Sequence, residues 1–216
     1  MNLSLFDLPE SDGLKERLGA GTMLLRGFAT RDAAELLADL EGVATASPLR
    51  YLETPGGYRM SVATTSCGEV GWVSDRTGYR YDAWDALGDR PWPQMPASFL
   101  SVARHAAEAA GYAGFEPDSC LINRYEPGAK LSLHQDKDER DFAQPIVSVS
   151  LGLPAVFLWG GMQRSDATDR LMLRHGDVLV WGGPDRLRYH GILPLKDGRH
   201  PETGRARLNL TFRRAR

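Results

Sequence analysis

The chain has 216 residues, 42% of them hydrophobic and 25% charged, which is typical of one globular domain, so we expect a single domain over residues 1–216. The formal net charge of −2 excludes a chain that is basic overall, so any nucleic-acid site must be local. Cys67 and Cys120 are the only cysteines, which excludes a cysteine-rich zinc module and argues against a disulfide framework.

Membrane and export signals are absent from the sequence pattern. No apolar run reaches the roughly 18 residues needed to cross a bilayer. The N-terminal segment MNLSLFDLPESDG lacks the basic and apolar regions of a signal peptide. We therefore expect a monomer in the cytoplasm with no membrane partner.

Apolar residues at helical spacing predict two helices in the first half of the chain. The first begins at Thr30 as N-cap and has an apolar face made of Ala33, Leu36, Leu37 and Leu40. The second begins near Pro96, ends at Gly111, and carries the stripe Phe99, Val102, Ala103, Ala106 and Ala110. Between them, the segments TPGGYRM, SCGEVGW and DRTGYRYD are rich in glycine and aromatic residues and predict hairpins or loops that form a lid.

From Ser119 onward, short β-branched and apolar runs alternate with Gly, Pro and Asp. This pattern predicts an antiparallel sandwich or jelly roll with the helices packed on one sheet. The predicted fold is thus mainly β with flanking helices. Residues 1–115 form an N-terminal extension with the lid and support helices, and residues 116–216 form the jelly-roll core.

Three side chains form a candidate metal site. His134 and Asp136 are two residues apart in extended chain, so both project from one face, and His190 lies in a later strand, LRYHGIL. Two histidines and one carboxylate on one face of an octahedron leave open positions and suit iron(II). A chance surface pair is the alternative for HxD alone. We interpret the remaining histidines as ordinary surface or core residues: His105, His175 and His200.

The last strand alternates polar and apolar residues. Arg207, Asn209, Thr211 and Arg213 alternate with Leu208, Leu210 and Phe212. Two interpretations of the polar face remain open at this point. It is either exposed to solvent, or it binds a dicarboxylate through the two guanidinium groups, which pair with carboxylates in a bidentate way.

Five segments together resemble one known family: INRYEPGAKLSLHQDKDE, PIVSVSLGLPA, HGDVLVWGG, YHGILPLK and RLNLTFR. They are similar, in the same order, to the metal, co-substrate and core strands of the AlkB-type alkylation-repair dioxygenases. TPGGYRMSVA, CGEVGW and GYRY are similar to that family's nucleotide-recognition lid. The resemblance implies a double-stranded β-helix fold, a jelly roll that begins with the helical and lid extension.

The resemblance also implies roles for individual residues. His134, Asp136 and His190 would be the catalytic iron ligands. The residues implied to bind 2-oxoglutarate are Asn123, Tyr125, Arg207, Asn209 and Arg213. Those implied to bind the substrate are Thr54, Trp72, Tyr79, Asp138 and Arg164, with Trp72 stacking on a flipped base.

The implied reaction uses Fe(II), 2-oxoglutarate and O2 to demethylate 1-methyladenine and 3-methylcytosine in single-stranded DNA, releasing formaldehyde, succinate and CO2. Such methyl groups block base pairing and lower the cost of flipping the base out. RNA and double-stranded DNA stay open as substrates. Two alternatives remain: an oxygenase with the same iron site and another substrate, and a non-catalytic jelly-roll binding module.

Overall fold

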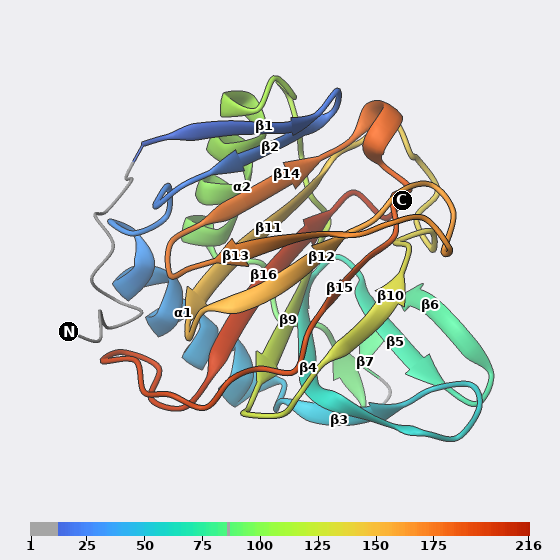
Figure 1. Ribbon diagram of the computed structural model, residues 1–216. Coiled ribbons are helices and arrows are strands. Elements are labelled where there is room, and N and C mark those ends of the chain that lie inside the picture. Colours follow the sequence, from blue (N-terminus) through green and yellow to red (C-terminus); the bar gives the residue numbers. More distant parts are fainter. Residues whose placement is uncertain (1–12, 86) are drawn as a thin grey trace.

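One antiparallel sheet of eight strands dominates the computed structural model, which describes residues 13–85 and 87–216. From edge to edge the strands are β1 (Lys15–Gly19), β2 (Thr22–Leu25), β14 (Val178–Trp181), β11 (Ile146–Gly152), β16 (Arg207–Arg213), β9 (Ser119–Tyr125), β4 (Arg59–Gly68) and β3 (Arg50–Glu53) (Figure 1). Strands from both sides of residue 116 share this sheet.

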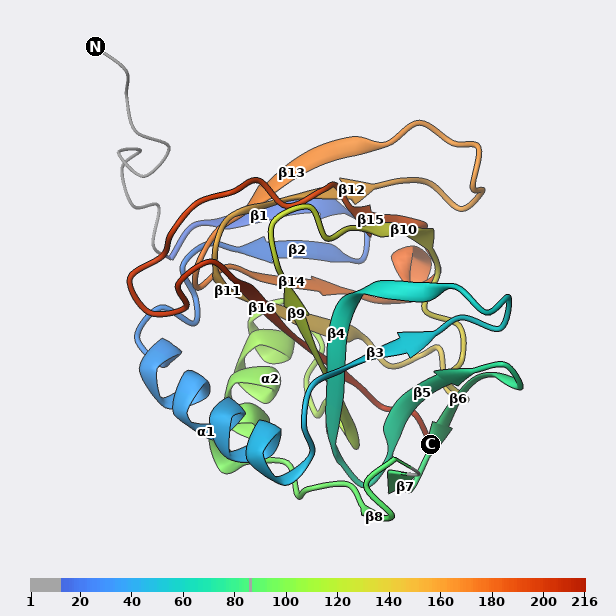
Figure 2. The ribbon, with the colours of Figure 1, turned by 90° about the horizontal axis from the view of Figure 1, so that it is seen from below.

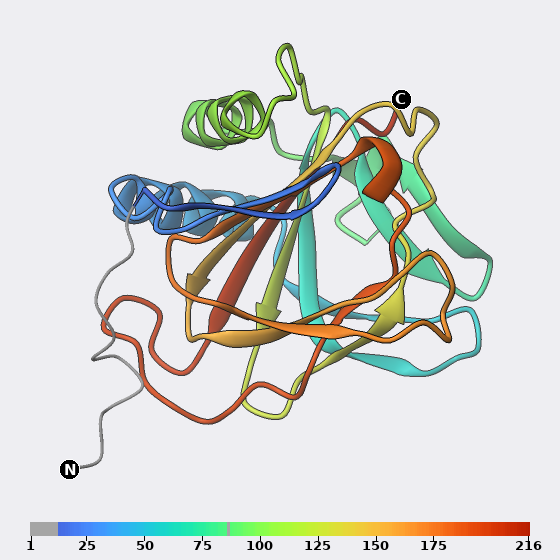
Figure 3. The same ribbon diagram turned by 45° about the horizontal axis from the view of Figure 1, so that its top comes forward.

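A four-stranded antiparallel sheet packs on one face of the large sheet (Figure 3). Its order is β10 (Leu131–His134), β15 (His190–Ile192), β12 (Ala155–Trp159) and β13 (Asp169–Leu173). Apolar side chains of both sheets form one core cluster, in which Trp181 of β14 lies 6.4 Å from Phe157 and 6.0 Å from Trp159, between ring centroids. Two facing antiparallel sheets are the predicted jelly-roll arrangement.

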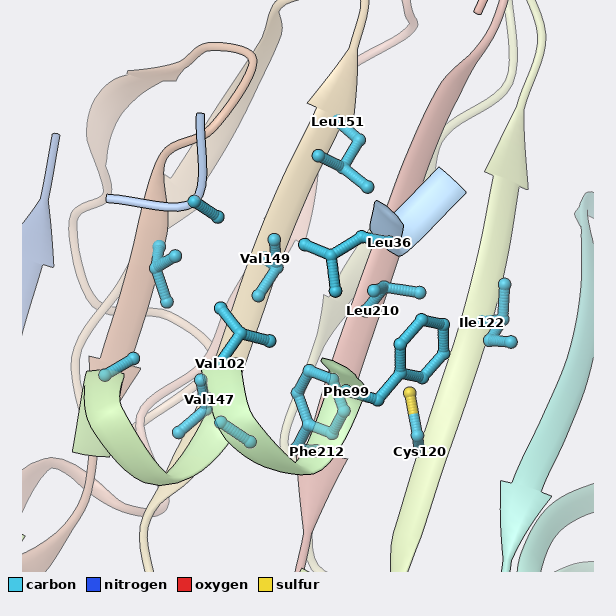
Figure 4. Packing of buried hydrophobic residues seen from close by; sticks show 14 of the residues in the cluster. Leu36, Phe99, Val102, Cys120, Ile122, Val147, Val149, Leu151, Leu210 and Phe212 are labelled. Carbon is cyan, nitrogen blue, oxygen red and sulfur yellow. The ribbon is translucent and has the colours of Figure 1, made fainter. Parts of the chain in front are cut away.

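Two helices, α1 (Ala33–Ala46) and α2 (Ala97–Ala109), cover the other face of the large sheet (Figure 2). A second core cluster fills the space between helices and sheet, and Figure 4 shows Phe99 of α2 against Phe212 of β16. Their rings meet edge to face, 6.0 Å apart. Burial of such aromatic and aliphatic side chains stabilises the domain by roughly 1.5–3 kcal/mol each. The helices therefore support the sheet from the side away from the smaller sheet.

The helix ends differ in part from the prediction. The N-cap of α1 is Asp32, so Thr30 was the wrong choice. Turns occupy the preceding residues: the Thr30 amide donates to the Gly27 carbonyl, and the first helical bond runs from Leu36 to Asp32. In α2 the predicted stripe is buried except at its end. Ala110 is a half-buried C-cap, whereas Ala107 is fully buried.

The predicted lid consists of hairpins. β5 (Gly71–Asp75) pairs with β6 (Gly78–Asp82), and β7 (Trp84–Asp85) pairs with β8 (Arg90–Pro91), in two small sheets of their own. β3 and β4 form a further hairpin, but they belong to the edge of the large sheet. We call β5 and β6 with their turn, residues 71–82, the recognition hairpin. Its strand β5 packs beside β3, β4 and β9 at one end of the large sheet (Figures 1 and 2).

All seven residues of β16 are buried, so neither of its faces is exposed to solvent. Leu208, Leu210 and Phe212 belong to the core cluster under the helices. The four polar residues point the other way and line a pocket between the two sheets: Arg207, Asn209, Thr211 and Arg213. The solvent-exposed interpretation of this face is therefore wrong. Only a ligand or an internal partner can satisfy the two arginines there.

The two cysteines are free and buried, and they face each other as Cα partners across β4 and β9. A short 3-10 turn (Gly183–Asp185) follows β14. Residues 1–12, on which the expectation about a signal peptide rests, lie outside the described residues. Within the described ranges, no helix is long and apolar enough to cross a membrane.

Candidate metal and co-substrate site

The candidate metal donors meet at the end of the small sheet. His134 ends β10, His190 begins β15, and the two are cross-strand partners with ring centroids 4.4 Å apart. Asp136 follows β10, and its Oδ1 lies 3.7 Å from Nε2 of His134 while its Oδ2 lies 3.9 Å from Nε2 of His190. One donor atom from each residue can thus reach a single ion. Two nitrogens and one oxygen with open positions on the far side fit iron(II).

Hydrogen bonds leave the correct nitrogen of each histidine free. Nδ1 of His134 lies 2.8 Å from the Ser132 carbonyl oxygen, and Nδ1 of His190 lies 3.0 Å from the Arg188 carbonyl oxygen. A carbonyl can only accept, so each Nδ1 carries the proton and each Nε2 keeps a lone pair directed toward Asp136. Backbone carbonyls that orient metal-binding histidines in this way are a common feature of metal sites.

An aromatic wall encloses His190. The Phe157 ring stacks on it at 5.7 Å, and the Trp181 ring meets it edge to face at 5.2 Å. Burial and the neighbouring His134 lower the pKa of His190 to about 4, so its imidazole is neutral near pH 7. Burial opposes ionisation of Asp136, but the guanidinium of Arg213 outweighs it and lowers the pKa of that carboxyl below its ordinary value. Neutral imidazoles and an ionised carboxylate are the protonation states that bind metal.

All thirteen site residues named from the sequence line one pocket of about 620 Å3 between the two sheets. The pocket floor holds the three metal donors and the polar face of β16, and the recognition hairpin contributes Trp72 and Tyr79. This volume is in the range of small-molecule sites.

The two arginines of β16 have separate partners in the pocket. Nη2 of Arg207 donates to the Ser150 hydroxyl at 2.9 Å, and its guanidinium lies over the Tyr125 ring at 5.0 Å. Arg213 donates from Nε and Nη2 to Oδ2 of Asp136, at 3.1 and 2.7 Å. Within the described residues, Nε and Nη1 of Arg207 and Nη1 of Arg213 are buried without an acceptor. Free buried guanidinium N–H groups fit the carboxylates of 2-oxoglutarate.

Two asparagines are also predicted to bind the co-substrate, Asn209 and Asn123. The Asn209 amide donates to the Ser148 hydroxyl and to the Val149 carbonyl, and its oxygen accepts from Thr211. Both of its N–H groups are thus already engaged. Asn123 is its cross-strand partner on β9 and is also buried in the pocket lining.

Trp72 and Tyr79 form a stacked pair in the recognition hairpin, with ring centroids 5.5 Å apart and planes 14° from parallel. Nε1 of Trp72 donates to Oδ2 of Asp138 at 2.9 Å, which links the hairpin to the segment after β10. Arg164 is exposed at the pocket. Thr54 has a local role in addition, because its hydroxyl accepts the Tyr58 amide within the turn before β4.

The sequence did not single out two residues of the pocket lining, Glu139 and Tyr81, or the buried Arg186 that is bonded to Glu139. Glu139 is buried and bonded to Tyr81 and Arg186. These partners are 58 and 47 residues away along the chain, so no local pattern could connect them. The available signal was a glutamate inside the segment HQDKDE that the resemblance had already marked.

A second group, His175, His200 and Glu202, also brings donor atoms within reach of one ion. Its hydrogen bonds argue against a metal. Nδ1 of His175 accepts the Gly152 amide at 3.1 Å, so the ring proton must be on Nε2, which lies 3.2 Å from the Glu202 carboxylate. The pattern is the reverse of that at His134, and it leaves no lone pair for an ion.

The comparisons with known proteins agree with this geometry. Residues 21–213 match the model of the 2OG-Fe(II) oxygenase superfamily. The chain belongs to this superfamily. It is 62% identical over 201 residues to the alpha-ketoglutarate-dependent dioxygenase AlkB of Salmonella typhimurium, covering 93% of each chain. It is 57% identical over 206 residues to the protein of the same name in Escherichia coli, covering 95% of each.

The fold is likewise similar to the solved structure of OsALKBH1, with a TM-score of 0.78 and 28% identity, covering 93% of this chain and 100% of that one. The chain is therefore an AlkB-type dioxygenase that depends on Fe(II) and 2-oxoglutarate and uses O2. Membership of this enzyme family, together with the three metal donors brought within reach of one ion, argues against the non-catalytic binding module.

Proposed function

We propose that this dioxygenase removes methyl groups from alkylated nucleic-acid bases, with single-stranded DNA as its main substrate. The observation that carries the proposal is the stacked pair Trp72 and Tyr79 in the lining of the pocket that holds the three metal donors. Aromatic faces with nearby cations are how proteins hold the bases of single strands. A relative in Mus musculus named nucleic acid dioxygenase ALKBH1 supports this substrate class; it is 32% identical over 130 residues, 59% of this chain and 33% of that protein.

Within this proposal, His134, Asp136 and His190 hold Fe(II), and Arg207 and Arg213 bind the two carboxylates of 2-oxoglutarate. The free buried N–H groups of both arginines support the second assignment. Bound iron, 2-oxoglutarate and O2 supply the oxidation that hydroxylates an N-linked methyl carbon, after which formaldehyde leaves and succinate and CO2 remain.

The chain's own residues place the base. Trp72 provides a face for stacking, and Asp138 provides a carboxylate oxygen, Oδ1, that has no partner in the described part of the chain. That oxygen suits the exocyclic amino group of adenine or cytosine, which is a donor in both bases. A methyl group on the pairing edge of 1-methyladenine or 3-methylcytosine lowers the cost of flipping the base into such a pocket.

The test compares Trp72→Ala with the parent enzyme on an oligonucleotide that carries 1-methyladenine. Loss of one stacking face should cost about 1–3 kcal/mol per base, which is roughly a five- to 150-fold loss of affinity. Anaerobic titration should show unchanged binding of iron and 2-oxoglutarate. Trp84→Ala is the matched control, because Trp84 is an exposed tryptophan of the neighbouring hairpin outside the pocket lining. Equal demethylation by parent and Trp72→Ala would reject the base site and favour an oxygenase with another substrate.

A further inference from the structure

Glu139 is a buried carboxylate whose two oxygens are both occupied. Oε1 accepts the Tyr81 hydroxyl at 2.6 Å and lies 3.3 Å from Nε of Arg213, and Oε2 accepts from Nη2 of Arg186 at 3.0 Å. The Glu139 side chain is 2% exposed. A buried carboxylate is tolerated only when it is paired and hydrogen-bonded in this way. Its contacts with Tyr81 and with Arg213, which donates to the metal donor Asp136, place Glu139 between the recognition hairpin and the metal site.

One end of this network belongs to the recognition hairpin. Tyr81 lies on β6 directly opposite Trp72 on β5, since the two are cross-strand partners. Burial raises the pKa of Tyr81 well above its ordinary value, so the hydroxyl stays a donor at any working pH. Removing the Tyr81 hydroxyl would therefore detach the hairpin strand from Glu139 without changing the stacked pair.

The other end belongs to the co-substrate site. Two carboxylates hold the guanidinium of Arg213: Asp136 takes Nε and Nη2, and Glu139 approaches Nε. Nη1 is the group left over, buried and without an acceptor in the described residues. Arg186 holds Glu139 in place relative to the backbone, because its other nitrogens donate to the carbonyls of Asp136 and Gln144. The direction in which Nη1 of Arg213 points thus depends on how Glu139 orients the Arg213 guanidinium.

We propose that Glu139 is a positioning residue that couples the recognition hairpin to the 2-oxoglutarate site, through Tyr81 on one side and Arg213 on the other. A hairpin held on Glu139 fixes the Arg213 fork in the orientation that a carboxylate needs. In return, a carboxylate on Arg213 holds Glu139 and so the hairpin. Coupling between two sites is reciprocal, so each event favours the other. The hairpin then presents its stacking face in the form of the enzyme that already carries its co-substrate.

This inference rests on the proposed role of Arg213 in co-substrate binding, and its test needs no nucleic acid. The Fe(II)-loaded enzyme is kept under nitrogen with and without 2-oxoglutarate, and amide hydrogen exchange is followed in the peptides of β5 and β6. In the parent, 2-oxoglutarate should slow exchange in the hairpin by at least about fivefold, the lower end of ordinary coupling factors. In Tyr81→Phe the ligand-induced change should disappear.

Glu139→Gln is the second variant, since it keeps the shape but removes the charge that orients Arg213, and it should also lose the coupling. Tyr112→Phe is the matched control. The Tyr112 hydroxyl donates to the Gly21 carbonyl at 2.8 Å, away from the pocket lining, so this variant loses a similar hydrogen bond and should keep the full ligand effect. A merely structural role for Tyr81 would shift exchange equally with and without ligand.

Three outcomes would overturn the inference: 2-oxoglutarate that binds the parent without slowing hairpin exchange, Tyr81→Phe that keeps the parental ligand effect, or Tyr112→Phe that loses it as fully. A different result would show that Arg213 does not bind 2-oxoglutarate. It would appear as Arg213→Lys binding 2-oxoglutarate as tightly as the parent, and it would remove the basis of the coupling whatever the exchange data.

Discussion

Replacing Arg207 with methionine should make the ligand-free protein more stable while abolishing co-substrate binding. Arg207 is 1% exposed, has no carboxylate partner in the described residues, and leaves two buried nitrogens, Nε and Nη1, without acceptors. Burial lowers the pKa of Arg207, which Tyr125 opposes only in part. An uncompensated buried cation destabilises the fold and persists where function requires it.

The size of the effect follows from the unsatisfied groups. Each buried donor without a partner costs about 1–3 kcal/mol. Methionine keeps the unbranched apolar stem but leaves part of the guanidinium volume empty, and such a void costs on the order of 1 kcal/mol. The lost bond to Ser150 costs about 1 kcal/mol more. We therefore expect Arg207→Met to raise the free energy of unfolding of the metal-free protein by about 2 kcal/mol.

Urea unfolding checks this with Arg26→Met as the matched control. Arg26 is also a largely buried arginine, but it is paired with Glu16 at 2.8 Å and with Asp177 at 2.7 Å. Breaking that compensated pair should destabilise the protein by about 3–5 kcal/mol. The two substitutions thus have opposite signs for the same chemical change.

Co-substrate should reverse the order of stability. With Fe(II) under nitrogen, 2-oxoglutarate at a hundred times its Kd stabilises the parent by about 2.7 kcal/mol and leaves Arg207→Met unaffected. The reasoning is refuted if Arg207→Met is less stable than the parent without ligand, or if 2-oxoglutarate stabilises both proteins equally.

Three further predictions concern the metal site and the lid. His134→Ala should lose iron, measured by metal analysis, yet unfold cooperatively in urea because the apolar cores are untouched; tight stoichiometric iron in this variant would contradict the ligand assignment. Gly191→Ala should lower iron affinity about ten- to hundredfold in a competition titration. The new Cβ would lie 2.7 Å from the Leu131 carbonyl oxygen and push β10 away from β15, which carry the two histidine ligands. An iron affinity equal to that of the parent would contradict this prediction. Burial opposes ionisation of Asp85, but bonds from Arg50 and Ser47 outweigh it and lower the pKa of Asp85 below its ordinary 3.8. This stabilisation is present above pH 3.8 and is lost as the pH falls further. The difference in free energy of unfolding between the parent and Asp85→Asn, measured in urea, should therefore become smaller only below about pH 4. A difference that already becomes smaller between pH 5 and 7 would contradict the prediction.

Local periodicity predicted much of the fold. The alternation in β16 and the short apolar runs identified the jelly roll, and the stripe of Phe99, Val102 and Ala103 identified α2. The start of α1 was wrong because the turns around Thr30 compete with helix for the same backbone groups. Such competition depends on contacts that a linear pattern does not contain.

The clustering of the candidate metal donors was predictable because His134 and Asp136 are close in sequence and, with His190, resemble a family motif. The network around Glu139 was not, since a buried carboxylate looks like a surface one until its partners are known. The alternating pattern also did not decide whether the polar face of β16 is exposed to solvent or enclosed in a pocket. Only the pairing of β16 with β9 and β11, and the smaller sheet beyond, determines that this face is enclosed.

Because β16 contributes both to the core and to the pocket, the site depends on the register of this strand. Alternate residues of this one strand supply the support core and the pocket floor, so a slip of one position would exchange the two sets completely. Leucines would then face the metal donors, and arginines would face the helices. A deletion of one residue in the middle of β16 should therefore reduce stability and activity together, because the same hydrogen-bond ladder positions both sets of side chains.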